Sequence, residues 1–135
     1  MSEVLDLLLA GTVRNVQKEP ETAEIEIPRL SKLCGKPVVF RLRGLTYNQV
    51  GDLAGKEDMA AEIVLAGVVE PDLRDVKIAV KFGLLAQGEQ WGDHGVLPIA
   101  GVTALLLPGE IEEISRAVQR LSGYLRQTTK SVKKN

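Results

Sequence analysis

The sequence has little of what small catalytic and metal-binding domains commonly use. It contains one cysteine, Cys34, and one histidine, His94. A single cysteine excludes an internal disulfide and a cysteine-rich metal site, and it suits a reducing compartment such as the cytoplasm. Any pair of base and nucleophile would have to be built on His94, whose neighbours Glu89 and Asp93 lie in the same glycine-rich loop. Catalytic groups need rigid support, which such a loop does not provide. We therefore expect no catalytic residue, no bound metal and no cofactor.

A strong net charge and a long hydrophobic run are also missing. Seventeen basic against eighteen acidic residues leave a net charge of -1, so no overall field attracts a nucleic-acid backbone or an anionic membrane. The few aromatic residues are too scattered for the stacking platform of a single-strand binder. The first apolar run, VLDLLLAG, is too short to span a bilayer and carries Asp6. We expect a cytoplasmic protein that binds neither nucleic acid nor membrane.

The length of the chain indicates one domain. A chain of 135 residues can bury a core without disulfides or metals. We expect a single domain over residues 1–126, followed by a polar, basic and flexible tail over residues 127–135. The predicted fold class is α+β: mainly helical, with one small antiparallel β-hairpin near the N-terminus.

Two alternating segments predict that hairpin. In AEIEIPRL the isoleucines point to one face and the glutamates to the other, and in PVVFRLRGL the apolar residues alternate with arginines. The intervening SKLCGK is taken as the loop. Facing charges and facing apolar side chains are both matched by one register. The predicted pairs are Glu24–Arg43, Glu26–Arg41, Ile25–Leu42 and Ile27–Phe40.

Helical signals dominate elsewhere. Ser2 and Thr46 are suited to cap short helices, and Gly11 and Gly55 lie where those helices would end. An apolar, buried helix is predicted over residues 59–69 and an amphipathic one over residues 73–81. Prolines open the last two predicted helices, which begin at residues 98 and 108.

The stretch IVLAGVVEPDLRD places three carboxylates, Glu70, Asp72 and Asp75, around a proline. Such a cluster is a candidate for acid–base chemistry or for metal binding. Its setting favours a structural role, because Pro71 would end the buried helix and Asp72 would cap the next one. As an N-cap, Asp72 would contribute about 0.5–2 kcal/mol, which Asp72→Ala would remove.

The last predicted helix carries an unbroken apolar stripe: Ile111, Ile114, Val118, Leu121 and Leu125. Core packing is the favoured use of such a stripe, and contact with a partner or with a second copy is the alternative. Trp91 either tucks back onto the core, which we favour, or marks a contact surface. The candidate partner-binding residues are therefore Ile114, Val118, Leu121, Tyr124, Leu125 and Trp91.

The order of these segments resembles the XkdN-like family of phage and prophage tail assembly chaperones. The resemblance covers Ala23 to Tyr124 and rests on AEIEIPRLSKLCGKPVVFRLRGLTYNQVGDL, then IVLAGVVEPDLRD, then FGLL, then LLLPGEIEEISRAVQRLSGY. The most specific parts are the apolar run closed by GVVEPDL and the ending LLPGEI…LSGY. These motifs are structural, so the resemblance transfers no catalytic residue.

The resemblance implies a non-enzymatic role in tail morphogenesis. Such chaperones bind the tape measure protein during assembly, keep it soluble and do not remain in the virion. A frameshifted longer form often exists, and through it the major tail tube protein becomes a second expected partner; homo-oligomers are a further expectation. The alternative is a structural or adaptor tail protein that is incorporated into the virion. A small transcriptional regulator is disfavoured by the neutral charge and by the lack of a groove-reading helix.

Overall fold

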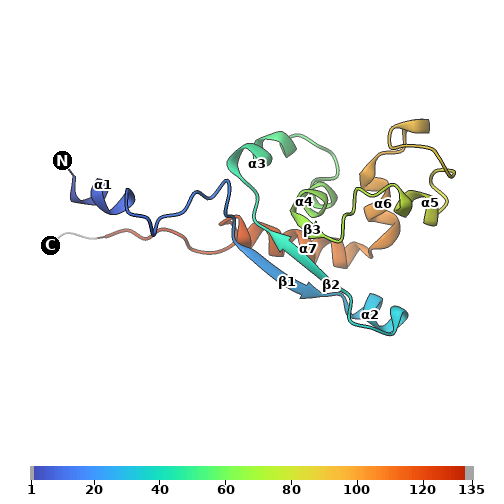
Figure 1. Cartoon of the computed structure of the whole chain (residues 1–135), viewed down its shortest axis with the longest axis horizontal. Helices are drawn as coiled ribbons and strands as arrows, with labels where there is room; N and C mark the ends of the chain where they lie inside the picture. The colour runs from blue at the N-terminus through green and yellow to red at the C-terminus, as the bar shows by residue number, and fades with distance from the viewer. Residues whose placement is uncertain (1, 133–135) are drawn as a thin grey trace.

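A computed structural model describes residues 2–132 and shows an α+β fold, mainly helical, in a single domain (Figure 1). This agrees with the predicted fold class. The elements in chain order are α1 (Glu3–Leu8), β1 (Thr22–Glu26), α2 (Pro28–Cys34), β2 (Val39–Arg43), α3 (Tyr47–Leu53), α4 (Met59–Gly67), β3 (Val68–Glu70), α5 (Lys77–Lys81), the 3-10 turn η1 (Asp93–Gly95), α6 (Pro98–Leu105) and α7 (Pro108–Leu121).

The sheet has three antiparallel strands in the order β1–β2–β3, one strand more than the predicted hairpin. Glu24 lies opposite Arg41 and Ile25 lies opposite Phe40. The predicted register is therefore wrong by two residues, and this corrects all four predicted pairs: Glu24–Arg43, Glu26–Arg41, Ile25–Leu42 and Ile27–Phe40. A shift by two residues keeps every side chain on its face, since the side-chain period of a strand is two. Only the partners change.

The reason for the shift lies in α2, which replaces the predicted loop. Pro28 occupies the first turn of this helix and Gly35 ends it with a left-handed φ of 71°. The backbone N–H of Ile27 donates to the carbonyl of Val38 at 3.0 Å. The pairing of β1 with β2 therefore begins directly at the two ends of the helical connection. The geometry of α2 thus determines which residues of β1 and β2 meet.

β3 accounts for one of the three clustered carboxylates. Val68 and Val69 were predicted as the end of a helix, but Val68–Glu70 pairs with β2 as a strand. Glu70 lies 3.2 Å from Arg41 in an ion pair. Arg41 therefore stands between Glu24 on β1 and Glu70 on β3. The predicted structural role holds for Glu70, through a contact that the sequence did not indicate.

The predicted N-cap at Asp72 is wrong. Asp72 Oδ1 accepts from the backbone N–H of Arg74 at 3.0 Å, and Asp75 Oδ1 accepts from that of Lys77 at 2.9 Å. Both carboxylates close local turns, because α5 begins only at Lys77 and has no side-chain cap. The helix predicted over residues 73–81 is thus shortened to its second half.

α4 and α7 form the centre of the core, with β2 and α6 packed around them. α7 runs along the sheet in Figure 1, and Gly67 at the end of α4 lies against the side chain of Val118. The buried apolar cluster consists of Ile27, Phe40, Leu42, Ala61, Val64, Leu65, Val68, Leu73, Val102, Leu106, Ile111, Ile114 and Val118.

A forked ion pair joins α2 to the start of α7. The guanidinium of Arg29 donates to Glu110 through Nε at 3.0 Å and through Nη2 at 2.8 Å, and Nη2 also donates to the carbonyl of Leu105. This hydrogen bonding lowers the pKa of Glu110 and raises that of Arg29. Glu110 also accepts from the backbone N–H of Leu107, so one carboxylate holds both the helix start and α2.

Two extended segments leave the domain on the same side (Figure 1). One carries α1, capped by Ser2 as predicted, and the other is the chain after α7. Residues 127–132 of the predicted tail are exposed and form neither helix nor strand. Its last part, residues 133–135, lies outside the described residues.

Candidate partner-binding surface

Two of the expected partner-binding residues lie in the core. Ile114 and Val118 are 1% and 0% exposed, so neither can meet a partner at the surface of this fold. Leu121 is half-buried and packs against the core cluster. Tyr124 and Leu125, beyond the end of α7, are 49% and 58% exposed. The stripe is therefore mainly a core stripe, as favoured, and only its C-terminal end reaches solvent.

Trp91 adopts the favoured arrangement and tucks back onto the domain. Its Nε1–H donates to the carbonyl of Arg74 at 2.6 Å. A Cβ placed on Gly101 would lie 3.4 Å from the ring, so the indole packs closely over α6. Trp91 is half-buried and joins the glycine-rich loop to α6 and to the segment before α5. It does not share a surface with the end of α7.

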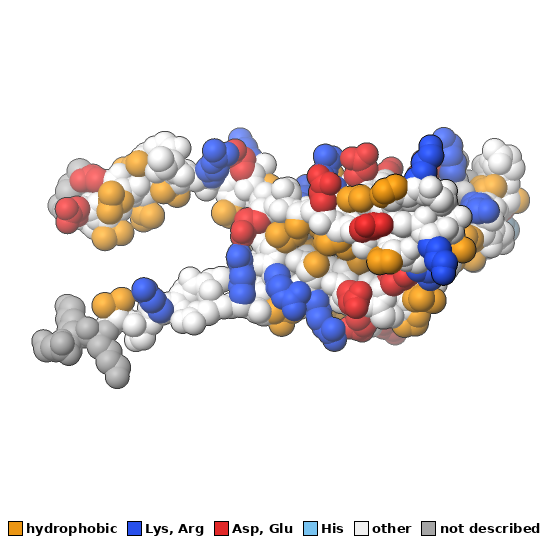
Figure 2. All heavy atoms as spheres, turned by 90° about the horizontal axis from the view of Figure 1, so that it is seen from below, with side chains coloured by type: hydrophobic (Ala, Val, Ile, Leu, Met, Phe, Trp, Pro, Cys, Tyr) orange, Lys and Arg blue, Asp and Glu red, His pale blue; other side chains and the backbone are white. Residues whose placement is uncertain are grey.

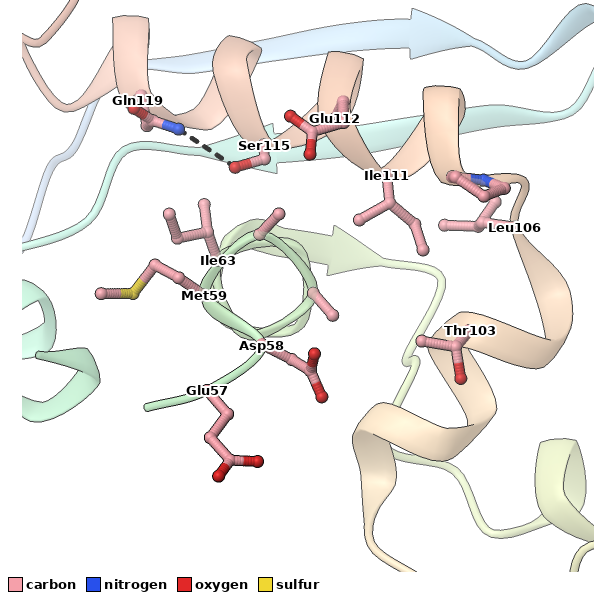
Figure 3. A pocket seen from close by; sticks show the side chains of 13 residues that line it. Glu57, Asp58, Met59, Ile63, Thr103, Leu106, Ile111, Glu112, Ser115 and Gln119 are labelled. Carbon is pink, nitrogen blue, oxygen red and sulfur yellow. Dashed lines mark hydrogen bonds between the residues drawn. The ribbon is translucent and has the colours of Figure 1, made fainter. Parts of the chain in front are cut away.

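A depression of about 660 Å³ lies between α4, α6 and α7 (Figure 3). We call it the acidic groove. Its apolar lining comes mainly from Met59, Ile63, Leu106 and Ile111, and its charged side chains are the carboxylates Glu57, Asp58 and Glu112. Ser115 at its base is buried and satisfied, since it accepts from the amide of Gln119 at 3.1 Å.

A second depression continues from the first along α7. This apolar groove, of about 300 Å³, lies between α3, α4 and the end of α7, and it is lined by Leu45, Val50, Leu53, Met59, Ile63, Gln119, Ser122 and Tyr124. It shares Met59, Ile63 and Gln119 with the acidic groove. The two depressions adjoin at these residues and are together called the α7 groove, whose far end is lined by an expected partner-binding residue, Tyr124.

Met59 and Ile63 are the residues that the sequence analysis missed. Both were assigned to a helix buried on all sides, yet Met59 is 39% exposed at the junction of the two grooves. They lie four residues apart, so they share one face of α4. Their spacing could have shown that shared face, but only the position of α3 shows that it stays open.

The lining of this surface suits contact with an apolar segment. No histidine or cysteine lines either groove. Within residues 2–132, no group of three or more His, Cys, Asp or Glu side chains is placed to hold a metal ion. An apolar floor of this kind fits an amphipathic helix laid along α7, and the carboxylates at one end favour a segment that carries basic residues there.

His94 and Glu89 form a charged pair within the glycine-rich loop. Glu89 Oε1 accepts from the backbone N–H of Ala86 at 2.6 Å, and Glu89 Oε2 contacts Nε2 of His94. The hydrogen bond from Ala86, followed by that from His94, lowers the pKa of Glu89, and the contact with Glu89 raises the pKa of His94. The pair is a loop clasp, and neither of its residues lines the α7 groove.

We expect the clasp to be pH-dependent in a direction that its geometry sets. Because the pKa of His94 is raised in the fold, the contact contributes stability below the ordinary histidine pKa of about 6.5 and loses it as pH rises through the folded value. An NMR titration of the His94 ring should show this raised pKa, and Glu89→Gln should return it toward the ordinary value. Asp93→Asn is the matched control, with a smaller effect. An unchanged His94 pKa in Glu89→Gln would contradict the clasp.

Among the described residues, no single helix is long and apolar enough to cross a membrane; η1 and α6 pass that test only together with α7, across a bend of 100°. Comparisons of the chain with protein-family models, with curated proteins and with solved structures found no match.

Proposed function

We propose that this protein is a phage or prophage tail assembly chaperone that binds the tape measure protein in the bacterial cytoplasm and keeps it soluble, without catalysis. The observation that carries the proposal is the α7 groove: two adjoining depressions, open to solvent, with apolar lining that includes Met59, Ile63 and Tyr124. The family resemblance of the sequence supplies the identity of the client.

The physics of such a client fits the groove. A long, helix-rich apolar protein exposes surface that aggregates unless another surface covers it. An amphipathic helix can lay its apolar face on Met59 and Ile63 while its basic residues meet Glu57, Asp58 and Glu112. Contacts of this kind are reversible, which suits a client that must later be handed to the tail tube.

The chain after α7 provides a route to a second partner. Tyr124 lines the apolar groove, and the residues after it lead away from the domain (Figure 1). In a frameshifted longer form, a segment added after these residues would bind the major tail tube protein and hold it near the bound client. A chaperone with both contacts would bring the two assembly components together.

Met59→Glu is expected to abolish retention of the tape measure protein in the soluble fraction when the two are co-expressed. Met59 lies at the junction of the two grooves, and a carboxylate there would be desolvated beneath an apolar client helix. The matched control is Leu33→Glu, which introduces the same charge at an apolar residue of α2 that is 72% exposed. Solubility of the client and its recovery by pull-down are the measurements.

The outcomes separate the alternatives. Both single variants should remain folded, because substitutions at exposed sites change stability by only about 0.5 kcal/mol. If the tape measure protein is equally insoluble with and without the native chain, and no complex is recovered, the chaperone proposal fails. Detection of this protein by mass spectrometry in purified virions would favour a structural or adaptor tail protein instead.

A further inference from the structure

The segment that carries α1 has an apolar surface that stays exposed among residues 2–132. Val4, Leu5, Leu7, Leu8 and Leu9 are all exposed, with Leu7 at 65% and Leu9 at 73%. Figure 2 shows these hydrophobic side chains gathered on a segment that stands clear of the domain. A helix of six residues is marginal in water and depends on packing for its stability. α1 therefore has the composition of a segment that docks.

A hydrogen-bonded turn over residues 14–19 lies between α1 and β1. Asn15 Oδ1 accepts from the backbone N–H of Gln17 at 2.9 Å, and the Asn15 carbonyl accepts from that of Glu19 at 2.8 Å. Arg14 pairs with Glu19 across the same turn at 2.9 Å. α1 stands apart from its own domain (Figure 1). Its apolar side chains are therefore exposed to a second copy.

Charge decides which groove accepts it. α1 carries Glu3 and Asp6 and no basic residue. The acidic groove is lined by three carboxylates and would repel it, whereas the lining of the apolar groove contains no charged residue.

We propose that α1 of one copy docks in the apolar groove of a second copy, with Leu5, Leu8 and Leu9 as its anchors. These residues recur at i, i+3 and i+4, the spacing by which a helix presents one face to a groove. Each copy then offers one helix and one groove, a head-to-tail contact that builds rings or open chains. This inference concerns the protein alone and stands whether or not the tape measure protein is its client.

Light scattering of the full-length chain at increasing concentration tests the association. The native chain should gain mass with concentration, and Leu5→Asp combined with Leu8→Asp should weaken self-association by about a hundredfold or more. These residues make no core contact, so the melting temperature should not change at concentrations where the native chain is monomeric. Leu33→Asp is the matched control and should associate normally. A native chain that stays monomeric, or a doubly substituted one that still associates, would overturn the proposal.

A mixed NMR sample locates the contact and separates docking between copies from docking within one. Copies with Cys34→Ser and Ala10→Cys carry a nitroxide just after α1, and they are mixed with ¹⁵N-labelled Cys34→Ser copies that carry none. Amide signals of Val50, Leu53 and Tyr124 should broaden in the mixture. Broadening only when the nitroxide and ¹⁵N are in the same molecule would show that α1 folds back on its own groove, and broadening elsewhere would show another acceptor; either result would overturn the proposal.

Discussion

Ile114→Ala is expected to lower the free energy of unfolding by about 2–5 kcal/mol. Ile114 is 1% exposed and belongs to the core cluster around α4 and α7, so truncation leaves a cavity that packed neighbours cannot fill. Urea denaturation followed by circular dichroism measures the change. The size of the effect distinguishes a core residue from a residue of a partner surface.

The control for this experiment is Leu125→Ala, from the same apolar stripe. Leu125 is 58% exposed, so its substitution should change stability by only about 0.5 kcal/mol. A loss below about 1 kcal/mol for Ile114→Ala would place Ile114 outside a packed core and return the stripe to the role of a partner contact.

Gly67→Ala is expected to cost about 1–3 kcal/mol or more, although alanine is the better helix former. A Cβ at this position would lie 2.5 Å and 2.6 Å from the two Cγ atoms of Val118, which is fully buried. Either Val118 or the spacing of α4 and α7 must change. Thermal and urea denaturation should both show the loss.

Gly51→Ala is the same chemical change with the opposite expected sign. Gly51 lies inside α3, and a Cβ there would meet nothing within 4 Å. Alanine has less backbone conformational entropy to lose on folding than glycine, so the substitution should stabilise the protein by about 0.5–1 kcal/mol.

A double-mutant cycle tests the contact between Gly67 and Val118. Adding Val118→Ala to Gly67→Ala should recover part of the loss caused by Gly67→Ala. Additive effects in that cycle would mean that the two side chains do not meet.

The two proposals have a joint consequence at the apolar groove. If α1 of a neighbouring copy occupies this groove when no client is present, the tape measure protein must displace it. Client binding should then reduce self-association, and Leu5→Asp with Leu8→Asp should bind the client at least as well as the native chain. Competition of this kind would keep the groove covered until it is needed, which limits aggregation of the chaperone itself.

Local chemistry made several elements predictable. Ser2 and Thr46 cap α1 and α3 as expected, and the Thr46 side chain with Gln49 forms a complete capping box. Pro98 and Pro108 open α6 and α7, in the first turn, where a backbone N–H would have no partner within the helix and its absence costs nothing. The apolar spacing of α7 correctly indicated one buried face. In each case the determinant lies within a few residues of the element that it specifies.

α2 could also have been predicted, because Pro28 and Gly35 are helix start and stop signals. The expectation of a hairpin loop overrode them, and the error displaced the strand register by two residues. β3 is different: three residues following α4 become a strand only because β2 offers free backbone groups beside them. No local signal separates such a segment from the last turn of a helix.

The sequence by itself determined the fold class, most helix starts and which face of α7 is apolar, since these depend on residue type and on spacing along the chain. Tertiary structure alone decided what covers each apolar face. Ile114 and Val118 are covered by α4 and the sheet. Met59 and Ile63 remain partly exposed to solvent, because α3 lies beside them and does not cover them. Periodicity orients side chains about one helix axis, but burial depends on where the other elements come to rest.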